Sequence, residues 1–295
     1  MDKRGIAIFA VTVIGVTWAV QGLLGTIPWT RSGGDLKGSF IHIAVLMIPA
    51  LAALLASIIR RDSEYPSLTL WPVPKYPALA VTAIVALIFV IVYSATTFLG
   101  KTTPDWKMSG LLVRLARNQQ VPIDPSFFLV AGFVITVLLG PTVYALACAG
   151  VEIGWRGYLF PKLLPMGRVR AHLVVGLLTA VWALPIVFNP FRNPARVPGQ
   201  FLFLLGISIA VSAFLNELWL QRRHAGLTAV CAGCFMSHAT GIWQYLFPNA
   251  DLPYGGTLGV VSILVWSAAA AIVYFLPATN LSDSPEPQVT EPIPE

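Results

Sequence analysis

The chain has 295 residues, of which 56% are hydrophobic and 11% are charged, with a formal net charge of +6 and a mean hydropathy of +0.75. Soluble domains carry roughly a quarter of charged residues, so this composition excludes a soluble globular fold and favours a chain that is solvated by lipid. The basic residues lie in short loops between apolar runs, which is typical of membrane proteins and excludes nucleic acid as a partner.

Eight apolar runs follow one another along the chain, each near the roughly 20 residues that a helix needs to cross the hydrocarbon of a bilayer. They cover residues 5–25, 40–59, 77–99, 126–149, 171–189, 199–220, 225–247 and 255–277. The first run lacks a small-x-small cleavage site, so it is predicted to be a span rather than a signal peptide. We therefore predict an all-α membrane protein, a bundle of about eight transmembrane helices that forms a single domain over residues 1–277.

Two segments depart from the pattern of spans. Residues 109–118 form a short amphipathic stretch that is predicted to lie at the membrane surface. Residues 278–295 hold four prolines and four acidic residues, so we predict a disordered acidic tail.

The distribution of basic residues predicts the orientation in the membrane. With the N-terminus inside, eleven lysines and arginines lie on the N-terminal side of the membrane and eight on the other. This bias in basic residues favours an orientation with both termini cytoplasmic. The multi-pass pattern without any organelle-targeting segment favours a bacterial plasma membrane.

Few ionisable residues are candidates for a position at membrane depth, in the apolar runs or in the continuation of the fourth run, and they are functional candidates because charge at that depth is costly. They are His42, Glu152, Arg156, Glu217 and His238. Glu152 and Arg156 are four residues apart, so they share a helix face and are predicted to form an ion pair. Glu217 lies near the end of its run and is predicted to snorkel or to pair with Arg222 and Arg223.

The remaining polar and aromatic residues of the runs are predicted to have structural roles. Cys148, Cys231 and Cys234 are expected to be small buried thiols rather than a disulfide framework. Cys231, Cys234 and His238 share one helical face, but one straight helix cannot bring three ligands to one metal ion. His42 stands alone and is predicted to be a packing residue. The tryptophans are expected mostly at the membrane interfaces.

Three strings resemble, in order, the motifs of the CPBP family, which comprises CAAX prenyl proteases and bacteriocin-processing or immunity (Abi) proteins. Residues 152–161, EIGWRGYLFP, resemble a first motif of two glutamates, three residues, arginine and Gly-Tyr-Leu-x-Pro. Residues 176–185 end in WALP and resemble a second motif that ends in Trp-His-Leu-Pro. Residues 219–226 resemble the turn before the third motif, in which His238 matches the family's histidine. The resemblance covers about residues 126–247.

The resemblance implies an intramembrane endopeptidase, in which the first glutamate and the second-motif histidine activate a water molecule. A histidine and an asparagine of the third motif would stabilise the oxyanion. In this chain the first glutamate position holds Val151, the second-motif histidine position holds Ala183, and the asparagine position holds Ile242. We therefore predict a non-catalytic pseudoprotease, without cofactor or metal, that binds or scaffolds another membrane protein or a lipidated peptide in the former active-site groove.

Two alternatives remain open at this point. An active endopeptidase would use the retained Glu152 and His238 to activate water, with Arg156 as the structural partner of Glu152. His172 does not replace the lost histidine, because it lies eleven residues before Ala183, about 16 Å lower along the helix axis. A transporter or channel is the third class, but the spans show no duplication between the two halves of the chain.

Overall fold

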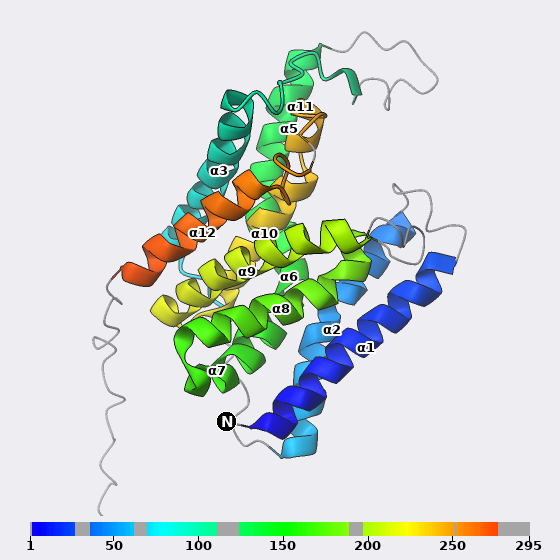
Figure 1. Cartoon of the computed structure of the whole chain (residues 1–295), viewed down its shortest axis with the longest axis vertical. Coiled ribbons are helices and arrows are strands. Elements are labelled where there is room, and N and C mark those ends of the chain that lie inside the picture. The colour runs from blue at the N-terminus through cyan, green and yellow to red at the C-terminus, as the bar shows by residue number, and fades with distance from the viewer. Residues whose placement is uncertain are drawn as a thin grey trace, which may run out of the picture.

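The computed structural model describes residues 2–26, 36–61, 70–110, 124–188, 197–250 and 252–276, and within these ranges all regular structure is helical (Figure 1). Most of the predicted amphipathic stretch 109–118, the acidic tail and the side chain of His42 lie outside the described residues. The helices are α1 Lys3–Thr26, α2 Leu36–Arg60, α3 Lys75–Phe98, α5 Pro125–Leu139, α6 Ala145–Glu152, α7 Phe160–Leu163, α8 Arg168–Val187, α9 Val197–Arg222, α10 Ala225–Thr240, α11 Trp243–Leu246 and α12 Val260–Phe275.

The helices have the lengths and composition that a bilayer requires. Six segments of the described chain are long and apolar enough to cross a membrane: Lys3–Leu23, Lys75–Phe98, Pro125–Met166, Arg168–Val187, Gly199–Arg222 and Ala225–Leu246. Two shorter apolar helical stretches, Ala44–Arg60 within α2 and Val260–Phe275, bring the total to eight. The prediction of an all-α, multi-pass bundle is thus confirmed.

The fourth span is one helical segment in which two π-helical turns flank α6. The first turn, Gly140–Tyr144, contains Pro141, which has no N–H to donate within the helix and therefore interrupts the ordinary hydrogen-bond ladder. The second turn, Ile153–Leu159, follows Glu152 directly. A π-helical turn rotates the residues after it relative to an ideal α-helix, so the side chains beyond Glu152 face different neighbours than a regular helix would give them.

Helix α10 occupies the centre of the bundle, between α3, α5 and α6 (Figure 1). The residues from Ala225 to Cys234 are all buried, and most of them are small. A Cβ atom on Gly233 would lie 2.4 Å from the backbone nitrogen of Ala145 and 2.5 Å from the carbonyl oxygen of Gly140. Small side chains here let two backbones approach closely, which is how membrane helices gain packing energy without a hydrophobic driving force.

Five of the tryptophans pack between helices rather than facing outward. They are at most 5% exposed and belong to the core: Trp155, Trp182, Trp219, Trp243 and Trp266. Trp71 and Trp106, in contrast, are 78% and 62% exposed just beyond the opposite ends of α3. Edge-to-face contacts such as Phe9–Trp155 and Phe214–Trp266 account for the buried ones, because large aromatic rings fill the spaces between helices.

Contacts among the helix ends define two faces of the bundle. The carboxylate of Asp2 accepts a hydrogen bond from Gly5 N at 3.0 Å and lies 3.3 Å from both Arg60 Nε and Lys162 Nζ. The hydrogen bond from Gly5, together with the two cations, lowers the pKa of Asp2. The ends of α2 and α7 therefore meet the start of α1, and we call this side the N-terminal face. On the opposite side, Asp105 N donates to the carbonyl oxygen of Leu246 at 2.7 Å.

Candidate functional site

A fully buried ion pair lies where α6 passes into the second π-helical turn. Arg156 Nη1 donates to Glu152 Oε1 at 3.0 Å, and the two residues are 2% and 0% exposed. The spacing of four residues places the two side chains on one face, as the sequence indicates. Removing either partner would leave a charge at membrane depth without a counter-ion, which is far more costly than losing a surface ion pair.

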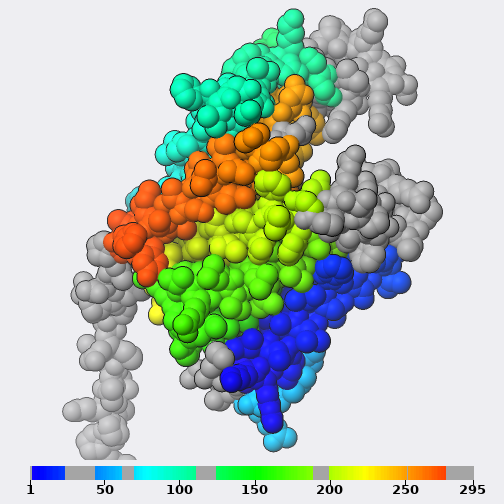
Figure 2. Space-filling view, in the orientation of Figure 1, coloured from blue at the N-terminus to red at the C-terminus, as the bar shows by residue number. Residues whose placement is uncertain are grey.

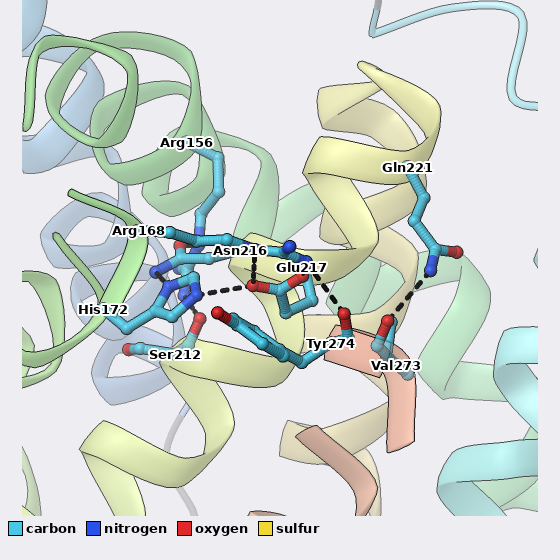
Figure 3. Close-up of polar contacts among 9 residues, drawn as sticks. All are labelled: Arg156, Arg168, His172, Ser212, Asn216, Glu217, Gln221, Val273 and Tyr274. Carbon is cyan, nitrogen blue, oxygen red and sulfur yellow. Dashed lines mark hydrogen bonds and ion pairs between the residues drawn. The ribbon is translucent and has the colours of Figure 1, made fainter. Parts of the chain in front are cut away.

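Helix α9 completes the coordination of Arg156, a contact that the sequence does not reveal. Arg156 Nε donates to Asn216 Oδ1 at 3.0 Å, and Nη2 donates to the carbonyl oxygen of Ser212 at 3.4 Å (Figure 3). Ser212 and Asn216 are one turn apart on α9, so they present two acceptors to one guanidinium group. The fork of donors in an arginine suits this arrangement, whereas a lysine would offer a single charged centre.

The same amide continues the network to α8. Asn216 Nδ2 lies 3.2 Å from His172 Nδ1, and His172 Nε2 lies 2.5 Å from Glu217 Oε1. Because Arg156 can only donate, the amide oxygen of Asn216 must face it and the amide NH2 must face His172. His172 Nδ1 therefore accepts a hydrogen bond, and Nε2 carries the proton that it donates to Glu217. The network thus fixes a neutral histidine in one tautomer.

Glu217 corrects one expectation from the sequence. It does not pair with Arg222 or Arg223; Arg168 donates to both of its carboxylate oxygens, with Nε to Oε1 at 2.7 Å and Nη2 to Oε2. Residues five positions apart on an α-helix point about 140° away from each other, so Arg222 cannot follow Glu217 toward α8. The guanidinium of Arg168 also bonds the carbonyl oxygen of Tyr274, which joins the end of α12 to the network (Figure 3).

The network is electrically balanced and does not form a proton path. Two carboxylates, Glu152 and Glu217, face two guanidinium groups, Arg156 and Arg168, and the histidine between them is neutral. Proton conduction would have to pass Asn216 and Arg156, but an amide and a guanidinium neither gain nor lose a proton at ordinary pH.

The three positions that the resemblance assigns to chemistry hold apolar side chains within the packed core. Val151 is 9% exposed and packs with the aromatic side chains of the cluster around Trp155. Ile242 is 4% exposed, and its side chain covers Gly132 on α5, where a Cβ atom would lie 2.4 Å away. Ala183 is partly buried and contacts both core clusters. None of the three offers a group that could bind or activate water.

His238 lies in an aromatic cluster rather than beside a carboxylate. Its Nδ1 accepts a hydrogen bond from Trp243 Nε1 at 2.8 Å, and its ring stacks on Phe89 with centroids 5.1 Å apart. An indole N–H can only donate, so Nδ1 of the neutral ring carries the lone pair and Nε2 carries the proton. Nε2 is buried and has no hydrogen-bond partner among the described residues. His238 can therefore donate a hydrogen bond but cannot act as a general base in this arrangement.

Glu152 and His238, which the active alternative would pair, lie at different levels of the bundle. The carboxylate of Glu152 lies beside Thr228 and Cys231 of α10. His238 comes seven residues after Cys231 on the same helix, which is about 10 Å further along its axis. The second oxygen of Glu152, Oε2, is buried and has no hydrogen-bond partner in the part of the chain described. The two residues therefore do not converge on one water molecule.

The thiols do not form a metal site. Cys148, Cys231 and Cys234 are all buried and unbridged. No group of three histidine, cysteine or acidic side chains within the described ranges has the geometry to hold a metal ion. Cys234 contacts Gly140 closely, with a distance of 3.1 Å between Sγ and the Cβ that Gly140 lacks. Its small size serves the close approach of α10 to the fourth span.

Comparison with known proteins adds no further constraint, since no family model matches the chain and no curated protein matches it.

The sequence singled out Glu152, Arg156, Glu217 and His238 but gave no role to Asn216. It also placed neither Arg168 nor His172 in the site. One signal was present: Arg168 and His172 are four residues apart at the start of α8, so they share a face. Nothing local indicates that this face meets Glu217.

Proposed function

We propose that the chain is a non-catalytic membrane protein related to the CPBP family, which acts by binding another membrane protein in the bilayer. The observation that carries the proposal is the loss of any water-activating pair among the described residues. Glu152 forms an ion pair with Arg156, and His238 can only donate a hydrogen bond because its Nδ1 already accepts one from Trp243. Val151, Ala183 and Ile242 contribute no polar group. An enzyme that loses its reaction can fill its polar cavity with apolar side chains, because this removes a desolvation cost.

Val151 and Ile242 are buried, so a partner cannot reach these two positions of the predicted groove. We therefore propose that the partner binds an outer surface of the bundle. Helix α5 is the best candidate, because Thr136 is the only buried residue of this apolar helix, all of which the structure describes. Its exposed residues follow a helical stripe: Phe127, Val130, Val134 and Leu138. A transmembrane helix of a partner would pack against this stripe through van der Waals contacts, which drive helix association in lipid. We further propose that the N-terminal face is cytoplasmic in a bacterial plasma membrane.

The absence of peptidase activity is the first expected result. The full chain in proteoliposomes should not cleave a prenylated peptide or a transmembrane test substrate at a rate that depends on Glu152. The measurement compares product formation by mass spectrometry for the wild type, Glu152→Gln and His238→Ala, with a CAAX prenyl protease as positive control. Cleavage by the wild type that Glu152→Gln abolishes would overturn the proposal in favour of an active endopeptidase. An equal cleavage rate in all three proteins would come from a contaminating peptidase.

A further inference from the structure

Helices α5 and α10 run antiparallel and meet at three levels of the bundle. The outermost contact is apolar, the middle one is polar, and the deepest one brings two backbones together. From the α11 end toward the middle of the bundle, the contacts join Gly132 to Ile242, Thr136 to Ser237, and Gly140 to Cys234. The three contacts therefore hold α5 in different ways.

The deepest contact fixes one end of α5. A Cβ atom on Gly140 would lie 2.9 Å from the Cα atom of Cys234, so the two backbones touch. Directly after it, Pro141 has no N–H to donate, and Thr142 Oγ1 donates to the carbonyl oxygen of Leu138 at 2.6 Å. A proline, a π-helical turn and a threonine that bonds four residues back all favour bending of a helix. The π-helical turn that begins here therefore forms a pivot that is anchored on α10.

Between the pivot and the outer end, two hydrogen bonds hold α5 through Thr136. The carbonyl oxygen of Thr136 accepts a hydrogen bond from Ser237 Oγ at 2.7 Å, and its hydroxyl accepts one from Ile242 N at 3.3 Å. We call Thr136 with these two donors the latch. Hydrogen bonds between membrane helices contribute only modestly to helix association, so the latch can open while the rest of the bundle stays folded.

The aromatic cluster around Trp243 lies behind α5. The ring of Phe133 on α5 meets the ring of Trp243 edge to face, with centroids 5.1 Å apart, and Trp243 donates to His238. In Figure 2 α11 and the residues after it lie at the surface, at one end of the bundle, beside the segment that follows α3. Movement of α5 away from α10 would therefore uncover Trp243 close to the end of the bundle.

We propose that α5 is a gate, which pivots at Gly140 and opens the aromatic cluster around Trp243 to the bilayer. The outer face of α5 is the exposed apolar stripe, so none of the described helices has to move aside when α5 turns outward. The open form gives an apolar molecule of the bilayer access to the cluster, and the closed form excludes it. This motion belongs to the chain itself and does not depend on the partner of the proposed function.

Thiol labelling of the full chain in proteoliposomes measures the open form. Ile242→Cys places a thiol under α5, where N-cyclohexylmaleimide, a lipid-soluble reagent, reaches it when the gate is open. Adding Thr136→Val and Ser237→Ala removes the latch. The labelling rate should then rise roughly 5- to 10-fold, because each of the two bonds contributes about a factor of three. Pro141→Ala restores an N–H at the pivot and should lower the rate.

Cross-linking of α5 to the end of α10 measures the closed form. A Cβ atom on Gly132 would lie 3.4 Å from the Cβ atom of Ile242, which is close to the spacing in a disulfide. Gly132→Cys/Ile242→Cys should therefore oxidise readily, and removal of the latch should slow this oxidation. Opposite changes in the labelling and oxidation rates distinguish an opened gate from a thiol of altered reactivity.

Thr82→Val is the matched control, because Thr82 Oγ1 accepts a hydrogen bond from Cys234 Sγ at 3.5 Å and so ties α10 to α3 instead of α5. This substitution should change neither rate. The native thiols Cys148, Cys231 and Cys234 are buried and should stay unlabelled in every variant. Rates that are unchanged by removal of the latch would overturn the proposal. Labelling of the native thiols together with the thiol at position 242 would also overturn it, since it would show a general loosening of the bundle.

Discussion

Arg156→Met is expected to lower the free energy of unfolding by about 3–5 kcal/mol, because it leaves the Glu152 carboxylate buried without a cation. The substitution also strips Asn216 Oδ1 and the carbonyl oxygen of Ser212 of their donor. Methionine keeps most of the side-chain volume, so a cavity contributes little to the loss. The effect is measured by equilibrium unfolding in mixed detergent and SDS micelles and by the thermal midpoint in mild detergent.

The double variant Glu152→Leu/Arg156→Met is the informative control for that result. Replacing both charges removes the desolvation cost together with the attraction, so at least half of the lost stability should return. Arg170→Met, at an exposed position of the same bundle, should change stability by less than about 0.5 kcal/mol. If single and double variants are equally destabilised, the pair does not hold the fold and the network is wrongly assigned.

Glu217→Gln is expected to cost about 2–4 kcal/mol. The amide keeps the shape of the carboxylate, but its NH2 group must face either Arg168 or His172, both of which donate to Glu217. The loss is smaller than for a fully buried pair because the Arg168 side chain is 38% exposed and can turn toward water. Unfolding in mixed micelles measures the effect.

The same substitution should loosen the end of α12, because Arg168 also holds the carbonyl oxygen of Tyr274. Hydrogen exchange at residues 270–276 should therefore rise in Glu217→Gln, with Gln221 still bonded to the carbonyl oxygen of Val273 as the second tie. Arg222→Gln, five residues further on, provides the comparison and should leave exchange there unchanged. Wild-type exchange in Glu217→Gln would show that α12 does not depend on the network.

The sequence predicted the parts of this molecule that depend on local physics. Run length and composition gave the spans, because the thickness of a bilayer fixes how many apolar residues a helix must offer. The spacing of Glu152 and Arg156 placed them on one helix face because four residues make slightly more than one turn. In both cases the cause acts within a single helix, so no knowledge of the partner helices was needed.

The rest depends on which helices become neighbours. Asn216 is one polar residue in an apolar run, and only the meeting of α9 with α8 and the fourth span makes it the link between Arg156 and His172. Glu217 was expected near the arginines that follow it in sequence, but the rotation of the helix directs it to Arg168 instead. The burial of tryptophans such as Trp155 was not predicted, for a related reason. Composition alone does not say whether an aromatic ring meets lipid or another helix.

The mass of the native complex, extracted in mild detergent from the source membrane, tests the proposed binding function most directly. The account predicts a stoichiometric complex with a second membrane protein, and it predicts that Val134→Trp on the exposed stripe of α5 disrupts this complex. Leu87→Trp, on an exposed position of α3, should leave the complex intact. A wild-type chain that runs alone at its monomer mass would contradict the account, as would a complex that survives Val134→Trp and dissociates in Leu87→Trp.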